Sequence, residues 1–378
     1  MSESYIAPLR SWLATPMRGD LADAVECIRR CADVQHVAVM PDVHLSSDIC
    51  IGVVIATSHL IYPQAVGGDI GCGMLAAAFD VEAPRLNPRI AAQILNDLAG
   101  AVPPRRRNRN ALVVQPAALA DGSLSDGPPK AVRRKEGELE FATLGSGNHF
   151  LELQADEENR LWLMVHSGSR AVGQAIRDHH VAHAPVVDGK FRALDAGSDA
   201  GRRYLQDAAW ARRFAAASRE AMAKEAGRVM SNVLGAGICW ETKIETDHNH
   251  VSMERHGGRE LWIHRRGAMP AQAGQPGVLP GSMGTASFHV EGRGNQEALC
   301  SSAHGAGRAM SRGRALSKIS ARDFRQQMEG IWYDCRLTGK LRDEAPTAYK
   351  DIRVVLQAQR ELVKVVRTLR PILSYKGV

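Results

Sequence analysis

Residues 67–74 are a glycine-rich stretch that contains two side chains able to bind a metal. Asp69 and Cys72 lie three positions apart, and four of the seven residues from 67 to 73 are glycine. Glycine permits the positive φ angles and close approaches of a tight turn. A carboxylate and a thiolate are both metal ligands, and such a turn could aim both at one ion. A glycine-rich turn around a buried cysteine would explain the same residues.

Five of the fourteen histidines lie in settings that resemble sites. Most of them adjoin polar or Gly/Ser turns at the ends of apolar runs, where a rigid scaffold presents functional groups. These residues are His44, His149, His166, His248 and His304. A lone histidine is more often structural, but together with Asp69 and Cys72 they supply the nitrogen, oxygen and sulfur donors of a transition-metal centre. One thiolate can bridge two ions. Ligand type alone leaves Mn²⁺, Zn²⁺ and Co²⁺ open.

Four turns rich in backbone donors indicate anion binding. They are Gly-Ser-Gly-Asn at 145–148, Ser-Gly-Ser-Arg at 167–170, Pro-Gly-Ser-Met-Gly at 280–284 and His-Gly-Ala-Gly-Arg at 304–308. Two of them end in arginine, and exposed N–H groups beside a guanidinium suit phosphate oxygens. Any one of them could instead be a tight turn between strands.

Several common nucleotide-binding devices are absent from the sequence. It contains no GxxxxGK[ST] motif, no GxGxxG that opens a helix after a strand, and no Lys-x-Asp-Gly in which a lysine would form a nucleotidyl adduct. If the protein uses a nucleotide covalently, His304 is the candidate nucleophile. Imidazole is competent at neutral pH, and a carboxylate such as Asp42 could orient it.

The composition limits the class of protein. The chain has 378 residues, of which 44% are hydrophobic and 24% charged, as in ordinary globular proteins. It contains no apolar run near the roughly 20 residues that span a bilayer, and no signal-peptide pattern, so we expect a cytoplasmic protein. Seven scattered cysteines without a CxxC pair argue against a disulfide framework. The net charge of +7 suits a polyanionic partner such as RNA or DNA.

Patterns of apolar and turn residues predict the elements that must position these groups. Strands are expected at 36–40, 49–57, 75–81, 149–154, 161–165, 260–263 and 287–291, and helices at 20–34, 88–98, 202–233, 305–318, 321–329 and 348–370, before a short tail from 372. Residues 102–140, with the arginine run at 103–110, are interpreted as a surface loop or insertion. The irregular order of strands and helices predicts a single α+β domain over residues 1–378.

The motifs taken together resemble the RtcB family of RNA ligases. They occur in the family's order, at residues 40–44, 69–74, 144–150, 166–170, 264–268, 280–284, 304–308 and 348–352 and at the terminal Lys376 and Gly377. The resemblance implies one compact α+β domain, with mixed β-sheets around a central metal site and with flanking helices.

The resemblance also implies an activity, a ligase that depends on GTP and Mn²⁺. Such an enzyme joins RNA 3′-phosphate or 2′,3′-cyclic phosphate ends to 5′-hydroxyl ends, in RNA repair or in sealing of the tRNA-splicing type. His304 matches the histidine that takes GMP in a phosphoramidate bond before the GMP passes to the RNA 3′-phosphate. The implied substrates are fragments of tRNA or ribosomal RNA. The sequence does not indicate whether a helper protein takes part.

Further residues match family positions with assigned roles. Cys72 matches a ligand that bridges two Mn²⁺ ions, with Asp69 and His149 on one ion and His166 and His248 on the other. The implied nucleotide contacts, besides His304, are Asn148, Glu152, Asn249, Ser282, Ser287 and Lys376. The implied phosphate or RNA contacts are Arg170, Arg308 and Arg312.

The sequence departs from the family pattern in two places. The family usually continues its first motif as His-x-Gly-x-Gly, whereas this chain reads His-Leu-Ser-Ser-Asp at 44–48, and it is shorter at about 105–140. These departures favour a divergent bacterial paralogue specialised in repairing a particular cleaved RNA. The alternative is a metal-dependent phosphoesterase acting on RNA ends, which would need the metal ligands but not His304. A third possibility is an RNA-binding relative without catalytic activity.

Overall fold

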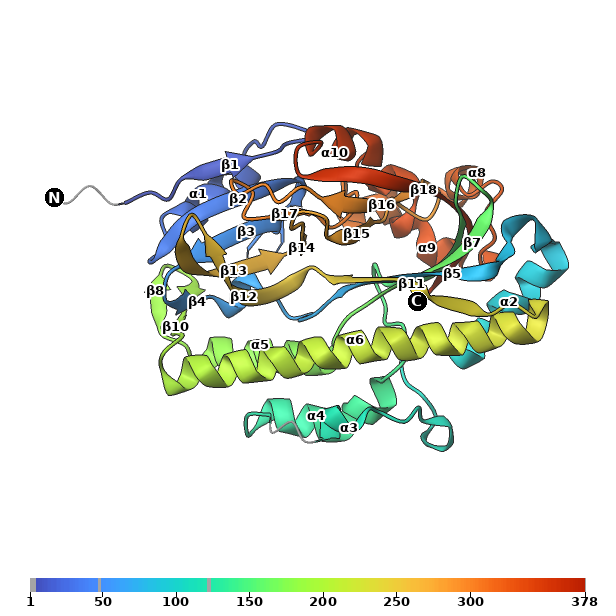
Figure 1. The fold of residues 1–378 in the computed structure, drawn as a ribbon, viewed down its shortest axis with the longest axis horizontal. Helices are drawn as coiled ribbons and strands as arrows, with labels where there is room; N and C mark the ends of the chain where they lie inside the picture. The colour runs from blue at the N-terminus through green and yellow to red at the C-terminus, as the bar shows by residue number, and fades with distance from the viewer. Residues whose placement is uncertain (1–4, 47–48, 121–123, 378) are drawn as a thin grey trace.

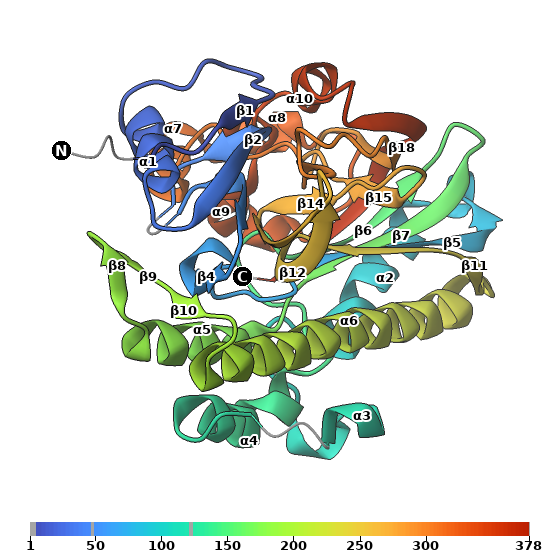
Figure 2. The same cartoon turned by 60° about the vertical axis from the view of Figure 1, so that its left-hand side comes forward.

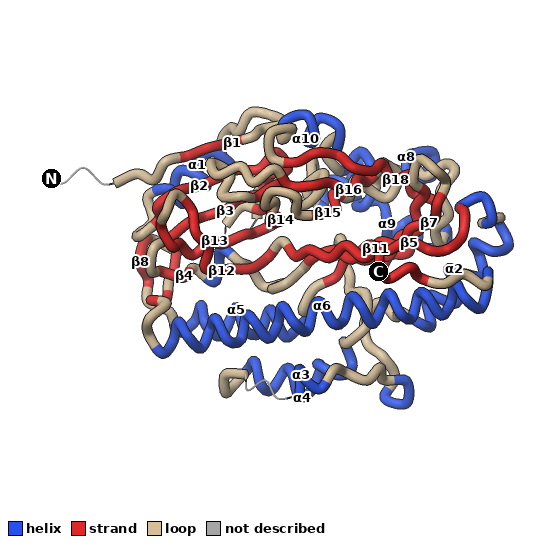
Figure 3. The backbone as a smooth tube through the Cα atoms, in the orientation of Figure 1, coloured by secondary structure: helices blue, strands red, loops and turns tan. Residues whose placement is uncertain are grey.

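The computed structural model describes residues 5–46, 49–120 and 124–377. Its β-sheets lie together on one side of the long helix α6 (Asp199–Leu234), and the helices α3 (Ala117–Ala120) and α4 (Pro128–Glu140) lie on the other side (Figures 1 and 2). The colouring by secondary structure in Figure 3 separates the layer of strands from these helices. The expected α+β class is therefore confirmed.

The larger sheet has seven strands and is antiparallel throughout. Its order is β11 (Ile238–Asp247), β5 (Gly73–Glu82), β7 (Arg160–Ser167), β6 (Phe150–Ala155), β18 (Val363–Lys376), β16 (Ser287–Gly292) and β15 (Pro276–Leu279). The last strand in the sequence, β18, therefore lies inside the sheet, between β6 and β16.

The second sheet has five strands, in the order β1 (Leu9–Ser11), β2 (Val34–His44), β3 (Ile51–Thr57), β13 (Arg259–Arg266) and β12 (Asn249–His256). The β1–β2 pair is parallel and the other pairs are antiparallel, so this sheet is mixed. Three two-stranded sheets accompany it: β4 (Leu60–Ile61) with β10 (Leu194–Asp195), β8 (Val186–Asp188) with β9 (Phe191–Arg192), and β14 (Ala268–Pro270) with β17 (Ser301–Ala303).

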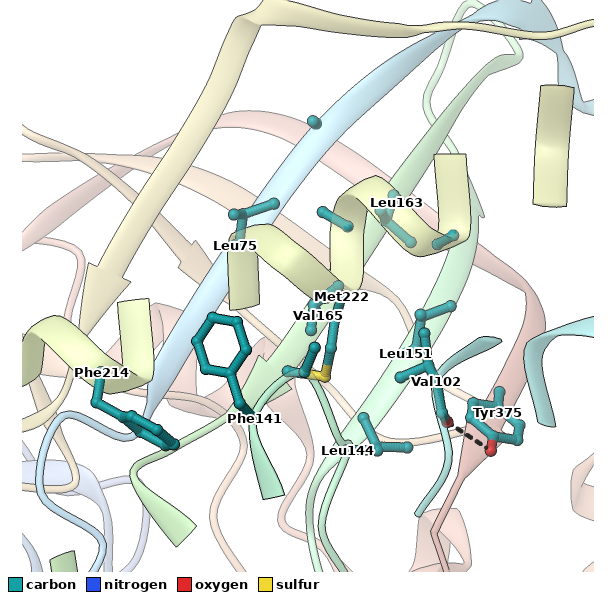
Figure 4. Packing of buried hydrophobic residues seen from close by; sticks show 14 of the residues in the cluster. Leu75, Val102, Phe141, Leu144, Leu151, Leu163, Val165, Phe214, Met222 and Tyr375 are labelled. Atoms are coloured by element: carbon teal, nitrogen blue, oxygen red, sulfur yellow. Dashed lines mark hydrogen bonds between the residues drawn. The ribbon is translucent and has the colours of Figure 1, made fainter. Parts of the chain in front are cut away.

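Both faces of the larger sheet are buried around strand β5. Alternate residues of a strand point to opposite faces, and Leu75, Ala77 and Phe79 join one apolar cluster while Met74 and Ala76 join another. The first cluster includes residues of α6 and of α2 (Pro88–Ala101), which cover that face. Figure 4 shows part of this packing, with Tyr375 donating a hydrogen bond of 2.9 Å to the carbonyl of Val102. A strand buried on both faces reads as a continuous apolar run, and the strand predicted over residues 75–81 is confirmed as β5.

Helix α6 begins and ends at residues suited to those positions. The Ser198 hydroxyl accepts a hydrogen bond from the backbone N–H of Gly201, and Gly235 ends the helix in the left-handed conformation. The remaining helices are α1 (Asp20–Arg29), α5 (Arg170–His183), α7 (Arg312–Lys318), α8 (Ala321–Gln327), α9 (Thr338–Leu341) and α10 (Ile352–Ala358). None of the helices in the described residues is long and apolar enough to cross a membrane.

The prediction of one helix over residues 348–370 is wrong. Only α10 is helical, and β18 follows it from Val363 to Lys376, so the expected tail is part of a central strand. The run Val363-Lys-Val-Val-Arg-Thr is β-branched and favours a strand, but its apolar spacing also fits a helix. Tertiary pairing with β6 and β16 decides between the two.

Three other predictions need correction. The helix expected over 305–318 is shortened to α7, because Gly307 has a φ of 70° and the preceding residues form turns. Residues 102–140 are not a loop throughout, since α4 and α3 lie within them. Strands β11 and β12 were not predicted, because their many charged side chains hide the strand pattern.

Candidate metal centre and adjoining cavity

The candidate metal ligands come from the ends of four neighbouring strands. His248 follows β11, Cys72 precedes β5, His149 precedes β6, and His166 is the second-last residue of β7. Because these strands are antiparallel neighbours in the order β11-β5-β7-β6, the four positions meet where the strands end, on one side of the sheet. The register agrees, since His166 pairs with Met74 on one side and with Phe150 on the other.

The structure brings all five predicted ligands into two groups that share Cys72. One group is Asp69, Cys72 and His149, and the other is Cys72, His166 and His248. The sulfur of Cys72 lies 3.5 Å from Nε2 of His149 and 3.2 Å from Nε2 of His166. His166 and His248 bring their Nε2 atoms to 3.4 Å from each other, and Asp69 Oδ2 lies 2.9 Å from Nε2 of His149.

The turn that carries Asp69 depends on close backbone approaches. Gly71 has a φ of 74°, and a Cβ there would lie 2.8 Å from the Cα of Arg212 in α6. A side chain at Gly168 would overlap the carboxylate of Asp69. The backbone N–H of Cys72 donates to the carbonyl of Asp69 at 3.0 Å, which closes the turn. Glycine at these positions therefore lets Asp69 and Cys72 converge.

Helix α6 supplies a buried cation that holds the turn against the sheet. One nitrogen of Arg219 donates to the carbonyls of Gly71 and Ser167, at 2.7 and 2.8 Å. The other terminal nitrogen donates to Glu245 at 3.1 Å. Arg219 thereby joins the Asp69–Cys72 turn to the end of β7, where His166 lies. Sequence reasoning did not find this residue, because one arginine among many in an amphipathic helix carries no distinct signal.

The protonation states of the cluster suit a metal site. Burial, with neighbouring histidines, lowers the pKa of His166 and of His248 well below the usual value, so both imidazoles are neutral. Burial and the charge of Asp69 raise the pKa of the Cys72 thiol. Burial also opposes ionisation of Asp69, but the hydrogen bond and charge of His149 outweigh it and hold its pKa at about 2. A cation would lower the pKa of the thiol and so favour its ligand form.

An unpartnered buried polar atom suits a bound cation at these residues. Asp69 Oδ1 is buried and has no hydrogen-bond partner, although buried carboxylate oxygens are normally satisfied. Neutral imidazole nitrogens, a thiolate and a carboxylate are the donor set of borderline divalent transition metals. The residues can therefore hold one ion in each group, with Cys72 common to both.

His304 lies beside this cluster and is oriented by Asp42. Its Nδ1 lies 2.6 Å from Oδ2 of Asp42, and its backbone N–H donates to the same oxygen at 3.1 Å. Asp42 is fully buried. The ring centres of His304 and His248 are 4.7 Å apart. With Nδ1 facing the carboxylate, Nε2 remains the nitrogen able to react.

A cavity of about 300 Å³ adjoins His166 and His304. Most of the residues predicted to contact a nucleotide or phosphate line it, namely Asn148, Glu152, Ser282, Ser287, His304, Arg308, Arg312 and Lys376. These residues come from the larger sheet, from the turns at 145–148, 280–284 and 304–308, and from the start of α7. Segments far apart in the sequence thus line one cavity.

Glu152 is the buried acid of this cavity. Its carboxylate accepts hydrogen bonds from Ser374 at 3.0 Å and from Gln154 at 2.9 Å, and Gln154 also donates to Ser287 at 3.1 Å. Burial raises the pKa of Glu152 to about 7, although Ser374, Lys376 and Gln154 act in the opposite direction. The group can therefore change its charge near neutral pH.

A second buried carboxylate, Glu344, forms ion pairs with the basic side chains that line the cavity. It accepts from Arg312 at 2.6 Å and from the Tyr349 hydroxyl at 2.7 Å, and it pairs with Lys376. Burial opposes its ionisation, but Lys376 and Arg312 lower its pKa. Glu344 could not be recognised from the sequence, because it lies in a polar segment without a motif. Tyr349 lies in the motif at 348–352, which was recognised without assigning it a role.

Three predicted contact residues have other partners in the structure. Asn249 donates to the carbonyl of Asp69 at 3.1 Å and accepts from the N–H of Gly267 at 2.9 Å, so it supports the metal turn and does not line the cavity. Arg170 also lies outside the lining and contacts Thr143 at 3.4 Å. Arg308 lines the cavity, but it donates to backbone carbonyls of Asp343 and Met310.

The departure from the family motif lies at the rim of the cavity. His44, Leu45 and Ser46 line it, and the hydroxyl of Ser46 accepts a hydrogen bond of 2.9 Å from Arg266. Leu45 has 51% of its surface exposed. Residues 47 and 48 of the same motif lie outside the described residues.

Comparison with known proteins identifies the family of the chain. The family described as tRNA-splicing ligase RtcB matches residues 24–377. An Escherichia coli K12 protein named RNA-splicing ligase RtcB is 35% identical, with 98% of each chain covered. RNA-splicing ligase RtcB2 of another Escherichia coli strain is 31% identical, covering 99% of this chain and 98% of its own. An Archaeoglobus fulgidus protein named tRNA-splicing ligase RtcB is 27% identical over 90% and 87% of the two chains.

The fold, the site and these relatives define the class of protein as an enzyme that joins RNA ends. The chain belongs to the RtcB family of RNA ligases. The resemblance inferred from the ordered motifs is thereby confirmed.

Replacing the shared cysteine should remove both metal ions. Cys72→Ala leaves only two ligands in each group, Asp69 with His149 and His166 with His248. If each group holds one ion, we expect metal content after gel filtration, measured by atomic emission, to fall from two ions per chain to near none. Cys335→Ala, at an exposed cysteine, is the matched control and should keep both ions. A fully loaded Cys72→Ala protein would contradict the shared-ligand assignment.

Proposed function

We propose that this protein joins RNA 3′-phosphate or 2′,3′-cyclic phosphate ends to 5′-hydroxyl ends, using GTP and two Mn²⁺ ions through a His304–GMP intermediate. The observation that carries the proposal is the position of His304. It lies at the wall of a nucleotide-sized cavity, beside the ligand cluster that shares Cys72, with Nδ1 against a buried carboxylate.

The chemistry follows from the orientation of the imidazole. Asp42 keeps the proton on Nδ1, so that the lone pair of Nε2 attacks the α-phosphorus of GTP. A P–N bond forms, the bond to the β-phosphate oxygen breaks, and pyrophosphate leaves. An oxygen of the RNA 3′-phosphate then attacks the same phosphorus and restores the imidazole. Finally the 5′-hydroxyl oxygen attacks the 3′-phosphorus, loses its proton and releases GMP.

The remaining residues supply binding and charge. A cyclic phosphate end must first take up water to give a 3′-phosphate. Mn²⁺, held by Asp69, Cys72, His149, His166 and His248, would neutralise phosphate charge. Glu152, Ser282, Ser287 and Lys376 would bind guanosine, and Asn148 and Asn249 would support phosphate near the ligands. Arg170, Arg308 and Arg312 would hold phosphates of the nucleotide or RNA, and the net charge of +7 suits an RNA partner in the cytoplasm.

The covalent intermediate can be tested directly. Wild-type protein incubated with Mn²⁺ and α-labelled GTP should acquire label that is acid-labile and stable to alkali. His304→Ala should acquire none, and His183→Ala, at an exposed histidine of α5, should label like wild type. Asp42→Asn should label about 100-fold more slowly, because the tautomer of His304 is no longer fixed.

The same experiment separates the ligase from a phosphoesterase. A metal-dependent phosphoesterase would alter RNA ends without labelling, and His304→Ala would retain that activity. Absence of label on metal-loaded wild-type protein would remove the proposed histidine intermediate.

Guanosine binding should depend on pH through Glu152. The raised pKa of about 7 means that Glu152 is neutral below pH 7, where its carboxyl no longer accepts from two donors of the guanine edge. Affinity should therefore rise about tenfold per pH unit up to pH 7 and level off above it, as for one linked proton. Calorimetry with guanosine measures this without phosphate titration. Glu152→Gln should bind weakly at every pH; an unchanged pH profile in that variant would exclude Glu152.

The altered motif at 44–48 should appear as substrate preference. If it marks a paralogue specialised for one cleaved RNA, the sealing rate should differ between broken tRNA and broken ribosomal RNA with identical end chemistry. Rates would be compared at equal ends and equal salt, because phosphate contacts weaken with ionic strength. Equal rates on both substrates would refute the specialisation.

A further inference from the structure

Lys350 joins the two segments that carry Asp42 and His304. Its ammonium donates to the carbonyls of Pro41 and Val43, at 3.0 and 2.7 Å. Its backbone N–H donates to the carbonyl of Gly307 at 2.9 Å. Lys350 is half-buried and does not itself line the cavity, although Gly307, which accepts its backbone N–H, does. These contacts lie on residues adjacent in sequence to Asp42 and three positions after His304.

The regular pairing of β2 with β3 is interrupted at this point, so carbonyls of β2 need other hydrogen-bond donors. Its pairing with β3 is regular from Val37 to Val39 and shifts before His44 pairs with Ile51. Across this irregularity, side chains contact the carbonyls of residues 41 to 43. Lys350 binds those on either side of Asp42, and Nδ1 of His44 lies 2.9 Å from the carbonyl of Asp42 itself. An ammonium has three donors and can serve two carbonyls at once.

The loop after His304 is packed directly against this bulge. Gly307 has a φ of 70°, and a Cβ there would lie 2.8 Å from the Cβ of Asp42. Gly52 approaches from the opposite side, where a Cβ would lie 2.7 Å from the Cα of Val43. Between these glycines, the only charged side chain among the described residues that donates to the carbonyls of residues 41 and 43 is Lys350.

We propose that Lys350 is a positioning residue for the nucleophile, acting through Asp42. By fixing the carbonyls on both sides of Asp42, it holds the carboxylate 2.6 Å from Nδ1 of His304 and so sets the tautomer and direction of the imidazole. This inference rests on the proposed function, since it assigns His304 as the group that takes GMP. It predicts an effect on the rate of adduct formation and none on the binding of guanosine.

The first experiment measures the adduct rate and nucleotide binding separately. Lys350→Met keeps an unbranched side chain of similar length and removes the donors. Its labelling rate with α-labelled GTP and Mn²⁺ should fall about 100-fold, the loss that a misplacement of about 1 Å can cause. Guanosine affinity should stay within about twofold of wild type, since a tenfold change would need about 1.4 kcal/mol. Lys340→Met, at an exposed position of α9, should leave both unchanged.

Two further readouts separate positioning from a general structural role. In an Asp42→Asn background, Lys350→Met should cause little further loss of rate, because both changes act on the same contact. Nitrogen-15 spectra of the imidazoles, in full-length protein loaded with diamagnetic Zn²⁺, should show His304 leaving its Nδ1–H tautomer in Lys350→Met. His304→Ala identifies the resonance. Lys350→Arg, whose planar fork can also donate to two carbonyls, should recover at least part of the rate.

The outcomes distinguish this inference from the proposed function. If wild type forms no adduct but the His304 resonance responds to Lys350→Met, the nucleotidyl chemistry fails and the positioning role stands. If the His304 resonance and the adduct rate are both unchanged, the positioning role is overturned. An equal loss in the Asp42→Asn background also overturns it. Should Lys350→Met not fold, Lys350→Gln, which keeps only a shorter neutral donor, is judged by the same spectra and rates.

Discussion

Burial of the strands β5, β7 and β6 on both faces is the constraint on which the site depends. A sheet covered on both sides can hold strand ends in fixed register, and the ligands lie at those ends. The three alanines of β5 allow close packing, with α6 against one face and a second apolar cluster against the other. Moving any of these strands by one residue would turn its side chains to the opposite face. The positions of Cys72 and His166 are therefore fixed by packing rather than by each other.

Concentrating ionisable groups at this edge has an electrostatic cost, and the structure offsets it with specific partners. His166 and His248 lose their charge through burial, whereas Asp69 keeps its charge through His149. Arg219 and Asn249 instead satisfy backbone carbonyls of the Asp69–Cys72 turn. The ligand atoms are thus left with unused lone pairs, a condition that favours a bound cation over a self-contained hydrogen-bond network.

The sequence predicted the chemistry of the site better than its architecture. Asp69, Cys72 and the histidines could be chosen because each adjoins a turn at the end of an apolar run, but their division into two groups came only from the family resemblance. Glu344 could not be found, because its significance lies in its contacts with Arg312, Tyr349 and Lys376. The strand β18 was predicted as a helix because its apolar spacing fits both periods, and only pairing with β6 and β16 decides.

The two parts of the site are held in different ways, and this difference bears on how the family motif could change at residues 44–48. The metal ligands are fixed by a regular ladder, whereas Asp42 lies in a bulge whose carbonyls are held by side chains. Those side chains come from His44 and from Lys350, and the backbone of Lys350 is anchored to Gly307 rather than to residues 45 and 46. Leu45 and Ser46 can therefore reshape the rim of the cavity while Asp42 stays against His304. Such an arrangement separates the altered rim of the cavity from the Asp42–His304 contact on which the proposed function depends.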